Sequence, residues 1–204
     1  MRIKGTSLAS FLSFLETEYG APRHRAFLAT LEPNLKKRCE GLILASAFYP
    51  YSELEMVALL ARQYFGGDID FFHRSGTHNA VVGLTGVYQA LLARPTPIDF
   101  LRAAERAWSQ FADTGAVRVE VIDDGRSIVR IEGLPPSEVL CARQTGFFEK
   151  SLEMAHAKKL KIQKTKCNVR GDAACEWTMA WDANASPRSY SQTQTSAIRR
   201  PVAI

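Results

Sequence analysis

Apolar residues recur at helical spacing through most of residues 8–113. The first such stretch places Leu8, Phe11, Leu12 and Leu15 on one face of a helix that Thr6 or Ser7 can cap and that ends at Gly20. The same spacing predicts further helices at His24–Leu31, Glu32–Cys39, Glu53–Phe65, Asp70–Leu92 and Ile98–Asp113. Phe48-Tyr49-Pro50-Tyr51 is expected to be an aromatic corner, and Ser52 with Glu55 forms a capping-box pattern for the helix that follows. Thr96 can cap the last of these helices. Most of these helices are amphipathic, so each has an apolar face that can pack in a core or against a second copy of the chain.

The pattern then changes from helical spacing to strict alternation. Val117, Val119 and Val121 alternate with polar residues, and an Asp124-Gly125 turn separates them from a second apolar run at residues 128–131. This arrangement is typical of a β-hairpin. Ser137 is a good N-cap for a helix that runs to about Ala155.

Two last strands, Leu160–Lys166 and Glu176–Trp181, flank a Gly171-Asp172 turn and predict a second hairpin. Two hairpins make a small antiparallel sheet, and the N-terminal helices are expected to pack on one of its faces. The predicted fold class is therefore α+β. Residues 1–183 are expected to form a single domain. Residues 184–204 have no periodic apolar face and are expected to be a disordered basic tail.

The helix predicted at Asp70–Leu92 is apolar nearly all round, which indicates burial. Its glycines Gly76, Gly83 and Gly86 each cost about 1 kcal/mol relative to alanine in a helix interior. Either another helix packs closely here, or the small residues leave room for a ligand. The second interpretation predicts a pocket between this helix and the sheet. Its expected lining is His78, Val81, Leu84, Tyr88, Trp108 and Phe147.

Composition narrows the class of protein. The chain has 204 residues, of which 46% are hydrophobic and 23% charged, as expected for a globular domain with a real core. No apolar run approaches the roughly 18–20 residues needed to span a bilayer. The N-terminus shows no secretion signal, so a cytoplasmic location is expected. The four cysteines are then expected to be thiols or metal ligands rather than disulfides.

The net charge of +5 is concentrated at two places. Three arginines and no acid lie in residues 184–204, which leaves the rest of the chain nearly neutral and gives little support to nucleic-acid binding. The other cluster is the lysine-rich segment Lys158–Lys166. Such a run usually marks a solvated edge strand, and a phosphate-bearing partner is the alternative.

Three cysteines, Cys141, Cys167 and Cys175, can converge if the helix that contains Cys141 packs beside the second hairpin. Three thiolates suit zinc, which takes four ligands in a tetrahedron. The spacing of eight residues between Cys167 and Cys175 is not the compact zinc-finger type, and no fourth ligand is obvious. Buried thiols without a metal are the alternative interpretation.

This pattern resembles the small-molecule-binding 4-vinyl-reductase domain. The sensory members of that family have a zinc site made by one upstream cysteine, a glutamate three residues before a second cysteine, and a third cysteine eight residues later. Cys141, Cys167 and Cys175 match the three cysteines, but Lys164 stands at the glutamate position. The resemblance thus implies a structural zinc ion, which Lys164 puts in doubt because lysine does not replace a carboxylate at neutral pH.

Residues 4–181 also resemble a related family of myxobacterial paralogues of unknown function. The matching features are Lys4-Gly5, Phe48-Tyr49-Pro50, Trp108 with Asp113-Thr114-Gly115, Gly146-Phe147-Phe148-Glu149, and Cys167-x2-Arg-Gly-Asp-x2-Cys175 with Trp181. Both families are similar in fold to haem nitric-oxide-binding domains and to vesicle-tethering subunits that hold an acyl chain. The implied fold is thus a ligand-binding domain of the NO-signalling or Golgi-transport type.

Catalytic motifs are missing from the sequence. No Gly-rich phosphate loop follows a strand, and no nucleophile elbow is present. His78 is more often a hydrogen-bonded core residue than a haem or metal ligand at such a position. The Tyr-x-Ser-x-Arg signature of the haem relatives is also missing, which argues against haem.

The sequence therefore favours a non-enzymatic sensory or adaptor domain. It is expected to bind a small apolar molecule or lipid and to signal through a protein partner. The alternative is a ligand-free homodimeric scaffold that associates through its N-terminal helices, with Phe11 and Leu15 at the interface. Nucleic-acid binding through Lys158–Lys166 is the third and weakest hypothesis.

Overall fold

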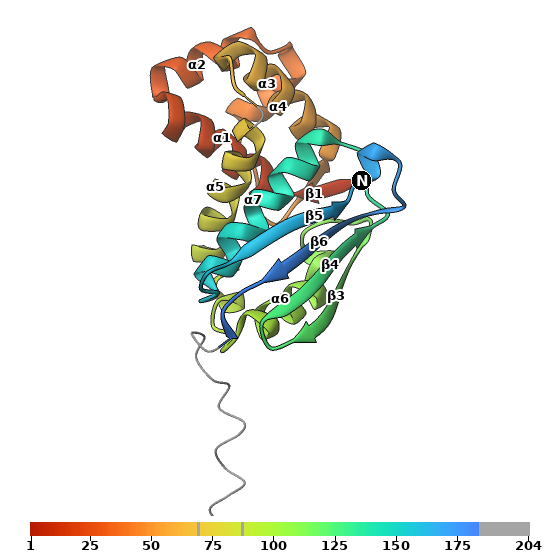
Figure 1. The fold of residues 1–204 in the computed structure, drawn as a ribbon. Helices are drawn as coiled ribbons and strands as arrows, with labels where there is room; N and C mark the ends of the chain where they lie inside the picture. Colours follow the sequence, from red (N-terminus) through yellow and green to blue (C-terminus); the bar gives the residue numbers. More distant parts are fainter. Residues whose placement is uncertain (69, 87, 184–204) are drawn as a thin grey trace, which may run out of the picture.

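The computed structural model describes residues 1–68, 70–86 and 88–183, so the predicted tail at residues 184–204 lies outside it. The helices are α1 (Gly5–Tyr19), α2 (Ala21–Thr30), α3 (Pro33–Glu40), α4 (Tyr51–Phe65), α5 (Asp70–Thr85), α6 (Pro97–Arg106) and α7 (Glu138–Met154). The strands are β1 (Arg2–Lys4), β2 (Phe48–Pro50), β3 (Ala116–Asp123), β4 (Arg126–Glu132), β5 (Lys161–Lys166) and β6 (Ala174–Ala180). Figure 1 shows α1–α4 gathered at one end and the sheet of β3–β6 at the other, with α5 and α7 running between them.

The larger sheet consists of the two predicted hairpins, and the α+β fold class is confirmed. Its strand order is β3-β4-β6-β5, and all of its pairs are antiparallel. The hairpins join along β4 and β6, where Val129 pairs with Trp177. The lysine-rich segment predicted as an edge strand is β5, at the edge of this sheet.

A second, two-stranded sheet was not predicted. Ile3 of β1 pairs with Tyr49 of β2, within the segment whose aromatic and proline residues had suggested only a corner. Because this pairing holds the chain next to the Leu44 carbonyl, α1 begins at Gly5, where an added Cβ would overlap that oxygen. The predicted cap of α1 at Thr6 or Ser7 is therefore wrong.

The side-chain caps predicted from the sequence set some of the other helix boundaries but not all of them. Ser137 and Thr96 cap α7 and α6 through their side chains, as expected. The capping box predicted at Ser52 is wrong, because α4 begins at Tyr51, two residues before the predicted start at Glu53 and directly after Pro50. The helix predicted to reach Leu92 ends at Thr85 and is followed by a short 3-10 helix, η1 (Gln89–Leu91).

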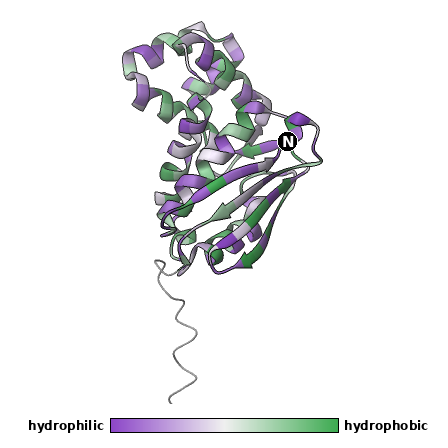
Figure 2. Ribbon diagram, in the orientation of Figure 1, coloured by the Kyte–Doolittle hydropathy of each residue, from purple (hydrophilic) through white to green (hydrophobic). Residues whose placement is uncertain are grey.

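The apolar side chains form two cores. One lies among α1–α5 and includes Phe11 and Leu15, both fully buried. The other lies between the sheet and α5–α7, around Val129, Trp177 and Met179. Figure 2 shows hydrophobic and hydrophilic residues alternating along the helices, as their amphipathic patterns predict. Within the described residues, no helix is long and apolar enough to cross a membrane.

Helices α5 and α7 cross with their backbones in direct contact. A Cβ added at Gly76 would overlap the carbonyl of Arg143, and one added at Gly146 would overlap the carbonyl of His73. Close helix packing therefore explains Gly76, one of the two interpretations left open by the sequence. Gly83, on the same helix, meets only a distant edge of the Tyr88 ring.

We expect Gly76→Ala and Gly146→Ala each to lower the free energy of unfolding by about 3 kcal/mol, the upper part of the range for overpacking, because the obstructing atoms are backbone. Gly83→Ala is the matched control. It should leave stability unchanged or raise it by up to about 1 kcal/mol through helix propensity. Urea unfolding followed by circular dichroism measures all three. If Gly76→Ala behaves like Gly83→Ala, the helices do not cross this closely.

Candidate functional site

A cavity of about 110 Å³ lies where the two cores meet. Its walls come from helices α1, α4, α5, α6 and α7 and from strands β1, β3 and β4. Most of the lining is apolar, with Phe100, Leu101, Trp108, Phe147 and Phe148 among its larger side chains. Apolar lining with few polar groups is usual for a small-molecule site.

The polar part of the lining centres on Arg143 of α7, which is only 5% exposed. Its guanidinium donates to Ser75 Oγ at 3.1 Å and to the Ser7 carbonyl at 3.5 Å, and it lies over the ring of Phe11. Burial lowers the pKa of Arg143 to about 10, so the side chain remains charged at neutral pH. Within the described parts of the chain, no Asp or Glu pairs with it.

Three further polar residues, Ser7, Asn79 and Gln144, line the same cavity, as does Tyr51. The Tyr51 hydroxyl shares a 2.8 Å hydrogen bond with Ser137 Oγ, and burial is the main reason why the pKa of Tyr51 is raised. Tyr51 therefore stays neutral and contributes no negative charge.

The six residues predicted to line a pocket are divided by the structure. Trp108 and Phe147 line this cavity, whereas Leu84 is buried in the core beside the sheet and Tyr88 lines a separate, more open hollow. His78 bonds Ser13 at 3.2 Å instead of facing the cavity, and Val81 is 38% exposed. Periodicity alone could not select the correct face, because the helix is apolar nearly all round.

Sequence reasoning missed Arg143. A signal was present, because Arg143 follows Val139 by four residues and precedes Gly146 by three, which places all three on one helical face. All three are buried. An arginine on such a face is rare enough to suggest a site.

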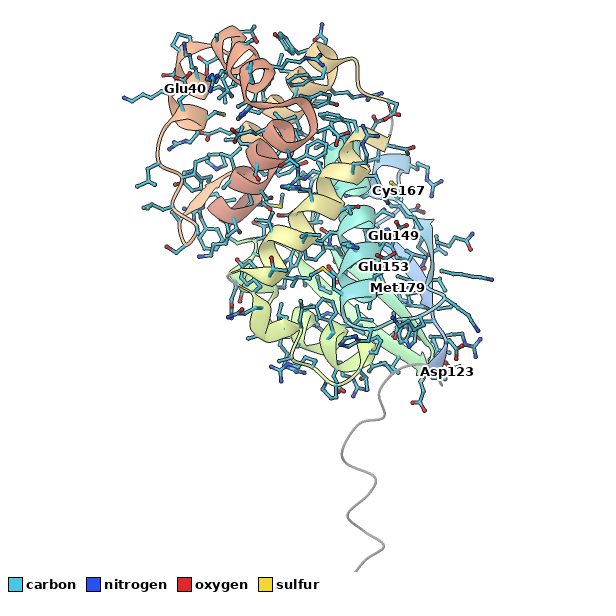
Figure 3. All side chains as sticks on the ribbon, turned by 90° about the vertical axis from the view of Figure 1, so that its left-hand side faces the viewer. Glu40, Asp123, Glu149, Glu153, Cys167 and Met179 are labelled. Carbon is cyan, nitrogen blue, oxygen red and sulfur yellow. The ribbon has the colours of Figure 1, made fainter. Side chains whose placement is uncertain are left out.

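The three cysteines predicted to converge do so, at the first turn of α7. Cys141 Sγ lies 3.6 Å from Cys167 Sγ and 3.5 Å from Cys175 Sγ. All three sulfur atoms lie within 4.8 Å of one another. Figure 3 shows Cys167 beside α7 and far from Asp123, which marks the other end of the sheet. The short 3-10 helix η3 (Asn168–Arg170) returns the chain from Cys167 toward Cys175.

Lys164 of β5 is the cation of this thiol cluster. It pairs with Trp177 across the sheet, and its ammonium lies 5.0 Å from the centre of the Trp177 ring. Burial tends to lower the pKa of Lys164, but the neighbouring thiols of Cys141 and Cys167 outweigh it and raise the pKa. The cluster therefore holds a positive charge at the position expected for a zinc-binding carboxylate.

The two thiols beside Lys164 differ in acidity. Burial raises the pKa of Cys141 to about 12. Burial also acts to raise the pKa of Cys167, but the nearby Lys164 ammonium and the backbone amide of Val169 outweigh it and lower the pKa to about 7. A thiolate at Cys167 paired with the Lys164 ammonium is thus the charge state that this arrangement favours near neutral pH.

Comparisons with known proteins place the fold. No protein-family model matches the chain. No curated protein matches it either.

Several solved structures do match, across 88% of the chain. An H-NOX protein from S. oneidensis in the Fe(II)NO ligation state matches with a TM-score of 0.71 at 11% identity over 99% of its length. The Fe(II) unliganded H-NOX protein from K. algicida gives 0.65 at 15% over 97%. An oxygen-binding H-NOX domain related to soluble guanylate cyclases gives 0.70 at 11% over 95%.

These matches establish the fold and correct several expectations. The fold is that of H-NOX domains. The assignment to the 4-vinyl-reductase domain and its myxobacterial relatives is wrong, since the solved neighbours are H-NOX proteins. The structural zinc ion implied by that resemblance loses its support with it, and Lys164 takes the place of the fourth ligand.

The expectation of no haem, which rested on the missing propionate motif, conflicts with the fold. Two of the solved structures that share this fold come from work on heme redox potential and on heme distortion in the H-NOX family. A missing propionate motif therefore does not distinguish this chain from proteins whose fold binds haem. Arg143 could face a haem carboxylate. However, none of the four histidines lines the cavity to ligate an iron, and its volume is below the roughly 150 Å³ of an engineered cavity that binds benzene. The described residues therefore do not fit a haem as they stand.

We expect the thiol cluster to titrate near neutral pH. Thiolate absorbance at 240 nm should rise with a midpoint near pH 7, and Cys167→Ser should abolish this step. Lys164→Gln should move the midpoint upward, because it removes the cation that stabilises the thiolate.

Cys39→Ser is the control for this titration. Burial raises the pKa of Cys39 to about 11, so its loss should not alter the step near pH 7. A midpoint that does not move in Lys164→Gln would show that the lysine does not stabilise the Cys167 thiolate.

Proposed function

We propose that this chain is a non-enzymatic sensor domain that binds a small apolar molecule in the cavity lined by Trp108 and Phe147. The observation that carries the proposal is that cavity, which has walls from both cores and a mainly apolar lining. The fold supports the proposal, because one of its solved examples is an oxygen-binding domain related to soluble guanylate cyclases.

The size of the cavity sets the size of the ligand. At about 110 Å³, it is somewhat smaller than an engineered cavity of roughly 150 Å³ that binds benzene. A compact molecule with one small ring therefore suits the site with slight rearrangement, whereas a long acyl chain would require the surrounding helices to separate.

Signalling through a protein partner is part of the proposal. A ligand can shift an equilibrium between two arrangements only if it binds them differently. The cavity is placed for such an effect, because Ile3 of β1 and Leu54 of α4 come from one core and Leu101 of α6 and Val129 of β4 come from the other. Ligand binding would favour one relative placement of the helical end and the sheet, which a partner could recognise. We also propose a cytoplasmic location, where free thiols such as the four cysteines persist.

The alternatives have less support. The predicted scaffold dimer used Phe11 and Leu15, but both are fully buried within one chain and are not available to a second copy. Nucleic-acid binding relied on the lysines of β5, yet Lys164 lies beside the thiols and Lys166 bonds Glu176 at 3.2 Å.

Toluene tests the cavity. We expect saturating toluene to raise the Tm of the protein, by about 2–4 °C for each kcal/mol of binding free energy. Ala104→Phe places a ring in the cavity and should remove this shift. Arg102→Phe adds the same ring on the exposed side of α6 and should retain it. The proposal fails if toluene changes neither the Tm nor the fluorescence of Trp108 in the unmodified protein.

A further inference from the structure

We propose that the ligand of this cavity is a compact apolar monocarboxylate and that Arg143 binds its carboxylate. This inference rests on the proposed function, since it names the chemical class of the molecule that the same cavity would hold. Binding of such a ligand has three requirements. The charged guanidinium must be buried, no group of the protein must neutralise it, and the rest of the site must accept an apolar body.

The first requirement is met by the placement of Arg143. The side chain lines the cavity and is 5% exposed, so water hydrates very little of it. Its two acceptors, the hydroxyl of Ser75 and the carbonyl of Ser7, are neutral, and the second bond is long at 3.5 Å. An arginine has five N–H donors, so these partners leave donors for a ligand.

The second requirement concerns the groups that face Arg143. Tyr51 is held neutral by its raised pKa, and His78 has a lowered pKa because of burial and then of the Arg143 charge. In the described part of the chain, no Asp or Glu forms an ion pair with Arg143. A buried charge without a partner is costly to a folded protein, and an anionic ligand would offset that cost.

The remaining lining decides the kind of anion. One positive charge matches one carboxylate, whereas a phosphate dianion would leave a buried negative charge in its place. A guanidinium also fits a carboxylate in a bidentate arrangement. Ser7, Asn79 and Gln144 offer further polar contacts, and the rings of Trp108 and Phe147 suit an apolar body. A cavity of this size favours a body close to a benzene ring.

Three probes of one shape separate charge from size. They are 4-methylbenzoate, 4-methylbenzamide and 4-methylbenzylammonium, which carry a negative, a neutral and a positive group on the same ring. Isothermal titration calorimetry of the full chain at pH 7.5 gives the affinity for each. We expect the benzoate to bind at least tenfold more tightly than the amide, and the ammonium not to bind.

Variants of Arg143 then test the assignment to this residue. In Arg143→Met the preference should reverse, so that the amide binds more tightly than the benzoate. Arg102→Met removes an exposed arginine of α6 and should leave the preference of the unmodified protein unchanged. Replacing a buried charge by an apolar group of similar length is often neutral or stabilising, so Arg143→Met is expected to fold.

The possible failures point to different conclusions. If the unmodified protein binds the amide and toluene as tightly as the benzoate, the inference is overturned and the proposed apolar site stands. If neither the three probes nor toluene binds, the proposed function fails as well. If Arg143→Met does not fold, the comparison of the three probes on the unmodified protein still decides whether the site selects a carboxylate.

Discussion

The fold depends on the close crossing of α5 and α7. Gly76 and Gly146 let the two backbones meet, and any larger residue at either position would collide with a carbonyl of the other helix. Because α5 also packs on α1 and α7 also lies over the sheet, this contact joins the helical end of the molecule to the sheet end. The cavity lies beside this contact, and its two sides belong to the parts that the crossing holds together.

Much of this architecture could be predicted because the relevant interactions are local. The alternation at Val117–Val121 with its Asp-Gly turn specified β3 and β4, and hydroxyl caps at Thr96 and Ser137 specified where α6 and α7 begin. The antiparallel sheet followed from the two hairpins, although the sequence alone could not show that β4 and β6 lie together at its centre.

What escaped prediction depends on contacts between distant segments. The pairing of Ile3 with Tyr49 joins residues far apart in the sequence, and it moved the start of α1 from the predicted hydroxyl cap to Gly5. Similarly, His78 and Val81 were placed in a pocket because a nearly uniform apolar helix offers no clear face. Arg143 was missed because its importance arises from the burial of its charge, a property that appears only when α1, α5 and α7 surround it.

Helix α7 is restrained at two points of its first half. Its opening turn is held by Cys141 against the sulfurs of the β5–β6 hairpin, and Gly146 is fixed against α5. Arg143 lies between these two anchors, so a ligand that pulls on its guanidinium cannot tilt the helix freely about either end. Beyond Gly146, His73 of α5 and Glu149 of α7 form a partly exposed pair that joins the two helices. A shift of α7 against α5 that begins at Arg143 would therefore alter this pair at the molecular surface.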